Sequence, residues 1–184
     1  AALKNLSAVS FPKTEEVSFD EFEHFTSITT IPDEYFRSSK LTSIVPPSSL
    51  KEIGSKAFYN CTSLTSFSLP ENITLRYQPF YGCSSLTEIT IPKGTTWSTD
   101  AFYKCTGLQK VTIESGIESI PATAFGYCEN LTSITIPSTV TSISEYAFEY
   151  CTSLRYITLP NSVTQIHQGV FCGCSNLQTV NLPE

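Results

Sequence analysis

The chain of 184 residues contains little charge, two histidines and no methionine. Because methionine is absent, we interpret Ala1 as a processed end or an artificial boundary, with any export signal removed. The charged fraction of 15% and the net charge of −6 argue against a nucleic-acid partner, which would require a basic stripe. No apolar run approaches the roughly 20 residues of a membrane span, and no basic amphipathic segment favours membrane adsorption.

The sequence also lacks the motifs of hydrolytic, nucleotide-binding and metal-dependent proteins. Its two histidines, His24 and His167, lie near opposite ends of the chain, so no Ser–His–Asp or Cys–His set forms around either without unusual folding. The paired carboxylates at Glu15-Glu16 and Asp20-Glu21 are explained by solvation and helix capping. We therefore predict a protein that is not an enzyme and that uses no metal or cofactor.

A short unit recurs along most of the chain, marked by a phenylalanine, a cysteine three residues later and a leucine three residues after that. The phenylalanines, 22 or 23 residues apart, are Phe58, Phe80, Phe102, Phe125, Phe148 and Phe171. The cysteines are Cys61, Cys83, Cys105, Cys128, Cys151 and Cys174, and the leucines are Leu64, Leu86, Leu108, Leu131, Leu154 and Leu177. Self-similarity at a fixed period of this length indicates stacked repeats.

The block Leu131 to Ile136, with apolar residues at its first, fourth and sixth positions, predicts a short strand that Pro137 ends. Val140 and Ile143 begin a second extended segment on the return path, and a tight turn follows at Phe148. No copy can bury its own apolar face, so neighbouring copies must stack with parallel strands about 4.8 Å apart. We expect such strands to begin near Leu41, Leu64, Leu86, Leu108, Leu131, Leu154 and Leu177.

Departures from the unit mark the two ends of the array. Residues 1–27 are predicted to form an N-terminal cap with a short helix, because Ser18 and Glu21 form a capping box and Phe19, Phe22 and Phe25 are three residues apart. Residues 28–184 then form the repeat array, beginning with half a unit. The sequence ends at Glu184 in the middle of a unit, so we expect an unsealed strand edge there, which a continuation of the chain or an end-to-end dimer would cover.

Several repeat positions allow a chemical or a structural interpretation. One cysteine per unit does not match the short spacings of zinc ligands, so we predict buried, reduced thiols, with Cys172 outside the column and exposed. Trp97 occupies the slot of Ile143 and is expected in the core. The column of Tyr59, Tyr81 and Tyr103 either stacks sugar rings or shields the turn, and we favour shielding.

The unit C-x-x-L-x-x-I-x-I-P-x-x-V-x-x-I-x-x-x-A-F resembles the BspA-like leucine-rich repeat, from about Ile28 to Glu184. The departures are Ser39 in the cysteine slot, Pro46 at an inward position and Glu114 in place of proline, which affect local geometry. The resemblance implies a right-handed solenoid with a parallel sheet on the concave face and short turns or 3₁₀ segments on the convex side. It also implies a secreted or surface-attached protein, in some cases an adhesin for host proteins.

We interpret the chain as an extracellular or cell-surface binding module whose concave face contacts a protein, with a host extracellular protein among the candidates. A structural spacer and a glycan-binding module are the alternatives. The outward strand positions are mostly Thr and Ser, and the departures are Glu88, Gln109, Lys110, Arg155, Tyr156 and Gln178. Glu88 and Lys110 are expected to pair with each other across adjacent copies. Arg and Tyr often anchor interfaces, so we predict a ligand site in the C-terminal half around Arg155 and Tyr156.

Overall fold

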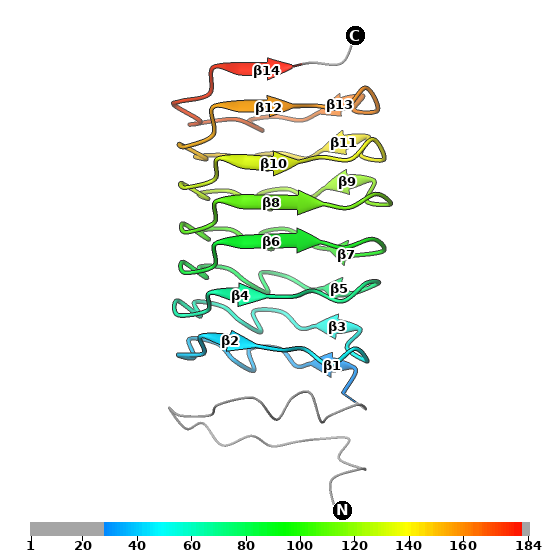
Figure 1. Cartoon of the computed structure of the whole chain (residues 1–184), viewed down its shortest axis with the longest axis vertical. Coiled ribbons are helices and arrows are strands. Elements are labelled where there is room, and N and C mark those ends of the chain that lie inside the picture. The colour runs from blue at the N-terminus through cyan, green and yellow to red at the C-terminus, as the bar shows by residue number, and fades with distance from the viewer. Residues whose placement is uncertain (1–27, 182–184) are drawn as a thin grey trace, which may run out of the picture.

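A computed structural model describes residues 28–181. The predicted cap helix within residues 1–27, including His24, lies outside the described residues. Within the described range the chain forms strands and turns and no helix. In Figure 1 the chain climbs from the N-terminal to the C-terminal end, running one way in front and the opposite way behind, which makes a right-handed solenoid.

Each turn of the solenoid contributes one strand to a front sheet and one to a return sheet. The front strands are β2 (Ser43–Ile44), β4 (Ser66–Phe67), β6 (Glu88–Ile91), β8 (Lys110–Ile113), β10 (Ser133–Thr135), β12 (Tyr156–Thr158) and β14 (Thr179–Asn181). The return strands are β1 (Thr30–Ile31), β3 (Glu52–Ile53), β5 (Thr74–Leu75), β7 (Thr96–Trp97), β9 (Ser119–Ile120), β11 (Ser142–Ile143) and β13 (Gln165–Ile166). The seven predicted strands are thus confirmed as the front sheet, the predicted concave face, each starting two residues after its leucine.

Every strand pairing in the described range is parallel and joins equivalent positions of adjacent turns, as Glu88 opposite Lys110 illustrates. The alternating burial within β6, where Ile89 and Ile91 face inward, matches the polar and apolar alternation of its sequence. Because the pairing repeats from turn to turn, residues of one repeat position form straight columns along the solenoid.

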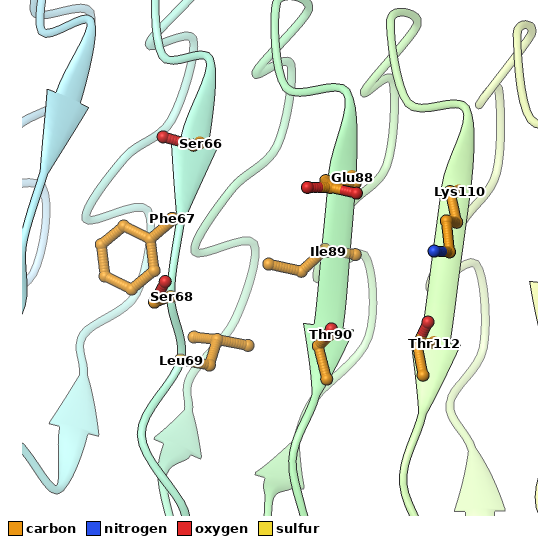
Figure 2. Close-up of a pocket in the computed structure, with 9 residues that line it drawn as sticks. All are labelled: Ser66, Phe67, Ser68, Leu69, Glu88, Ile89, Thr90, Lys110 and Thr112. Atoms are coloured by element: carbon orange, nitrogen blue, oxygen red, sulfur yellow. The ribbon is translucent and has the colours of Figure 1, made fainter.

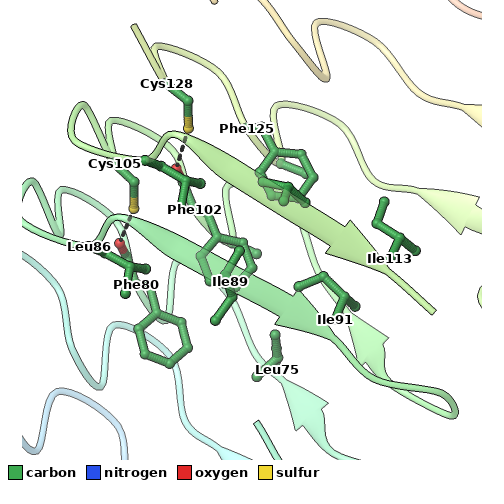
Figure 3. Close-up of a cluster of buried hydrophobic side chains, with 14 of the residues drawn as sticks. Leu75, Phe80, Leu86, Ile89, Ile91, Phe102, Cys105, Ile113, Phe125 and Cys128 are labelled. Carbon is green, nitrogen blue, oxygen red and sulfur yellow. Dashed lines mark hydrogen bonds between the residues drawn. The ribbon is translucent and has the colours of Figure 1, made fainter. Parts of the chain in front are cut away.

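The core between the two sheets is built around a stack of phenylalanines (Figure 3). Their ring centroids are 5.1 Å apart from Phe58 to Phe80 and 5.3 Å apart from Phe80 to Phe102. Trp97 packs against this core as predicted, in an edge-to-face arrangement with Phe125 whose ring centroids are 5.8 Å apart, although Trp97 remains partly exposed. Its indole N–H donates to the Ser119 carbonyl at 3.2 Å. This bond links β7 to β9, although the two strands form no ladder of backbone hydrogen bonds.

The cysteine column forms hydrogen bonds between turns as well as filling space. Each thiol donates to the carbonyl of the phenylalanine in the preceding turn, for example Cys105 to Phe80 at 3.2 Å and Cys128 to Phe102 at 3.4 Å (Figure 3). All seven cysteines are free, and Cys172 is exposed as predicted. Burial is confirmed for Cys61, Cys83, Cys105, Cys128 and Cys151. It is wrong for Cys174, which is only partly buried because no further turn covers it among the described residues.

The front sheet is interrupted at two junctions. At regular junctions the N–H of the residue after the repeat leucine donates to the carbonyl of the equivalent residue one turn earlier. The N–H of Gln109 donates to the Thr87 carbonyl at 2.8 Å, and the N–H of Thr132 donates to the Gln109 carbonyl at 3.0 Å. Within residues 28–181 this bond is missing between Thr87 and Thr65 and between Arg155 and Thr132. The strand ladder breaks at the same two places, which we call the β4–β6 seam and the β10–β12 seam.

Candidate binding surface on the front sheet

The predicted residues Arg155, Tyr156 and Gln178 lie together on the exposed face of the front sheet, beside the β10–β12 seam. Tyr156 begins β12 with 61% of its surface exposed, and its hydroxyl donates to the Gln178 side-chain carbonyl at 3.1 Å. Arg155 and Gln178 are also exposed, and a backbone bond of 2.9 Å joins them across adjacent turns. The three side chains form one patch, hereafter the Arg155 patch, beside the small exposed side chains of Thr132 and Ser133 in the preceding turn.

The predicted residues Glu88, Gln109 and Lys110 form a separate group in the N-terminal half of the same face. Glu88 and Lys110 are exposed and directly opposite each other in the register of β6 and β8. The expected ion pair is not formed in the described structure. In Figure 2 the Lys110 side chain runs along its own strand toward Thr112 instead of crossing to Glu88.

A shallow groove with a volume of about 240 Å³ lies over the β4–β6 seam and was not predicted from the sequence (Figure 2). Its lining comes from three adjacent strands and the segment after β4: Ser66, Phe67, Ser68, Leu69, Glu88, Ile89, Thr90, Lys110 and Thr112. Four of these side chains carry hydroxyl groups, and Glu88 and Lys110 add one charge of each sign. The groove is therefore a polar recess crossed by two opposite charges.

Phe67 is the largest apolar residue that lines the groove. The equivalent inward position holds Ile44, Ile89 and Val111 in neighbouring turns, whereas the Phe67 ring packs edge-on against Phe58 at 5.2 Å and Phe80 at 5.0 Å. Phe67 is the one aromatic residue in this column among the described turns. The β10–β12 seam, where the position holds Ile134 and Ile157, shows that a break in the ladder does not require an aromatic ring.

The tyrosine column forms a ladder on the turns that lead from the return strands to the front strands. Ring centroids are 4.6 Å apart from Tyr59 to Tyr81 and 5.3 Å from Tyr81 to Tyr103. The structure extends the ladder to Tyr127 and Tyr150, which come one residue later in the unit.

Neither end of this ladder offers a free ring face. The Arg37 guanidinium lies 5.2 Å from the Tyr59 centroid. At the other end the backbone of Gly173 lies so close that an added Cβ would be 2.6 Å from the Tyr150 ring. Sugar stacking requires an open ring face, so the arrangement supports the favoured interpretation that the rings shield the turns.

Other candidate chemistry is sparse in the described part of the chain. His167 is exposed, with its imidazole 3.7 Å from the Glu145 carboxylate on the return side. Among residues 28–181 no three His, Cys, Asp or Glu side chains gather in a way that could hold a metal ion. The same range contains no helix long and apolar enough to cross a membrane.

Comparison with solved structures gives several similar repeat proteins. A leucine-rich cell surface protein from Faecalibacterium prausnitzii is 38% identical with a TM-score of 0.75, over 83% of this chain and 42% of that chain. A leucine-rich repeat protein from Bacteroides ovatus is 32% identical with a TM-score of 0.79, over 86% of this chain and 41% of that chain. The chain thus spans about two fifths of the length of these two relatives.

A third similar structure, the leucine-rich repeat protein of T. pallidum, is 30% identical with a TM-score of 0.76, over 82% of this chain and 72% of that chain. None of the curated proteins matches the chain. The model of the BspA type leucine rich repeat region matches residues 4–98 and 95–184, and so also covers most of the segment predicted as a cap. The sequence unit, the stacked turns and this match agree, and the chain belongs to the BspA-type leucine-rich repeat family.

Proposed function

We propose that this chain is a non-catalytic binding module of a secreted or cell-surface protein, and that it contacts a protein partner through its front sheet. One relative, 38% identical, is a leucine-rich cell surface protein, which supports a location outside the cell. A host extracellular protein is the class of partner that such a location makes accessible.

The observation that carries the proposal is the Arg155 patch. The third position of the neighbouring turns holds Ser133 and Thr179, so a large exposed tyrosine interrupts a surface of small side chains. Arginine and tyrosine are enriched among the residues that dominate binding energy at protein interfaces. A spacer has no need for such a cluster. Glycan binding stays the alternative, because Tyr156 is itself an aromatic side chain exposed on the front sheet, although the tyrosine ladder has no open ring face.

A binding screen against extracellular matrix proteins and a glycan array tests the proposal. For a protein found in the screen, Arg155→Thr with Tyr156→Thr is expected to reduce affinity at least tenfold, consistent with loss of interface anchors. The matched control is Arg76→Thr with Tyr77→Thr, the same residue pair exposed on the return side. Unchanged affinity of the first variant, or equal loss in both, would assign binding elsewhere.

A further inference from the structure

Glu88 and Lys110 are opposite charges on adjacent turns that leave each other unpaired. Elsewhere the chain does form ion pairs between adjacent turns: Lys93 lies 3.2 Å from Glu71, and Arg76 lies 2.7 Å from Glu52. Both of those pairs are partly or largely exposed, so exposure does not explain the difference. The two charges at the groove are thus available to groups outside the chain.

The β4–β6 seam adds backbone groups to this charged recess. Across it the N–H of Thr87 and the carbonyl of Thr65 form no bond with each other, although the equivalent groups pair at the neighbouring junctions. Beside them lie the hydroxyl groups of Ser66, Ser68 and Thr90. A ligand that lies across this seam can bond to the two groups with its own peptide N–H and carbonyl groups.

We propose that the groove at the β4–β6 seam binds an extended segment of a partner protein, with a basic side chain at Glu88 and an acidic side chain at Lys110. The inference rests on the proposed function. It adds a second contact on the front sheet, apart from the Arg155 patch, and the chemistry of the ligand that binds there. An extended segment is favoured over a helix because a helix satisfies its own peptide groups and leaves the seam unpaired.

The spacing of the two charges sets the pattern of the ligand. Adjacent strands lie about 4.8 Å apart, and alternate side chains of an extended segment project from one face at about 6.6 Å. Flexible Glu and Lys side chains bridge that difference. The segment therefore carries Lys or Arg two residues from Asp or Glu. It crosses the strands along the solenoid and continues over the front sheet, which gives more contact than a small molecule gains from a recess of about 240 Å³.

Selection from a random peptide display library tests this inference directly. The probes are the unmodified chain, the charge-swapped variant Glu88→Lys with Lys110→Glu, and a control in which Glu71→Lys is combined with Lys93→Glu. Circular dichroism and melting temperature check that all three fold alike. We expect the unmodified chain to enrich peptides with a basic and an acidic residue two positions apart. These peptides should lose at least fivefold in affinity for the swapped variant and keep their affinity for the control.

Other outcomes separate this inference from the proposed function. Peptides without the charge pattern, or peptides that bind the swapped variant as tightly, overturn the groove site. Peptides that lose affinity only when Arg155 and Tyr156 are replaced by Thr overturn it while supporting the proposed function. No peptide binder at all, with binding confined to the glycan array, overturns both.

Discussion

At the residue scale, the repeat cysteine combines a small apolar body with a hydrogen-bond donor. The thiol fills its slot and also donates to a phenylalanine carbonyl of the preceding turn, at 3.2 Å for Cys83 to Phe58. In the first described turn Ser39 takes the same slot, and its hydroxyl lies 3.3 Å from the Cys61 sulfur. The Phe58 carbonyl also accepts the N–H of Cys61 in its own turn at 3.1 Å, so the Cys83 thiol is its second donor and links two adjacent turns at this carbonyl.

These surroundings also determine the reactivity of the thiols. Burial raises the pKa of Cys61 to about 11 and raises the pKa of Cys83, Cys105 and Cys128 as well. Since the thiolate is the reactive form, a raised pKa and burial act in the same direction. At the last turn, a hydrogen bond from Cys151 lowers the pKa of the partly buried Cys174.

We therefore predict stepwise thiol labelling at pH 8. Cys172 should react at once, Cys174 more slowly, and the remaining five thiols only after denaturation, as counted with a chromogenic disulfide reagent. Cys172→Ser is the control and should remove the fast phase alone. Three or more thiols reacting in the folded protein, or bridges detected by mass without reductant, would contradict this interpretation.

At the scale of strands and turns, the sequence predicted the regular parts and missed the junctions. The repeat Leu-x-x-Ile-x-Ile located every front strand, because side-chain burial in a strand follows from alternation within a few residues. The seams depend on contacts between turns, which the pattern within one unit does not describe. One seam lies beside Phe67, and the other lies between turns that carry Ile134 and Ile157 at the same position.

The tyrosine ladder shows the same limit. Three of its members share one repeat position, but Tyr127 and Tyr150 stand one residue later. In the turn of Tyr127 the vacated position holds Gly126, where an added Cβ would be 2.7 Å from the Tyr103 ring, and in the turn of Tyr150 it holds Glu149. Such contacts between neighbouring turns are visible only in space. The same holds for the candidate site. The sequence repeat predicted which columns of residues are exposed on the front sheet, but it did not predict the groove.

Amide hydrogen exchange offers a test of the seams. The amides of Thr87 and Arg155 have no partner across their junctions, whereas those of Gln109 and Thr132 do. We expect the first two to exchange at least tenfold faster than the second two, because exposed amides without hydrogen bonds lack protection. All four occupy the same repeat position, so Gln109 and Thr132 serve as internal controls. Equal protection at the four positions would show that the sheet is continuous.

At the scale of the whole molecule, stability depends on the contacts between adjacent turns. Each turn touches its neighbours alone, so an inner turn is packed on both sides and an end turn on one. Phe102 is fully buried in the middle of the stack. Phe171, in the last described turn, lies 5.9 Å from the Phe148 ring and is partly buried.

Replacing these two phenylalanines with alanine should therefore have unequal effects. Phe102→Ala is expected to reduce the free energy of unfolding by about 3–5 kcal/mol, as for other large core truncations. Phe171→Ala should reduce it by about 1–2 kcal/mol, because a partly exposed ring buries less apolar surface on folding. Urea unfolding monitored by circular dichroism measures both. Equal losses would show that the array unfolds as a globular domain in which position along the stack does not matter.

The last described turn also bears on self-association, which we propose occurs through this end. Ile166 is 44% exposed, and Leu177 and Val180 are only partly buried, so apolar side chains face outward along the solenoid axis. Among the described residues β14 has a ladder partner on one side, and an open strand edge can pair with another chain. We expect the sedimentation coefficient of the chain to rise with concentration, and Ile166→Lys to shift this rise to higher concentration. Val45→Lys, at an exposed position of the front sheet in the first turns, is the control and should leave association unchanged. A lysine at position 166 disrupts association only if this apolar edge is buried in the dimer, because burying an unpaired charge is costly. A monomer at every concentration, or equal effects of both substitutions, would therefore exclude this end as the contact.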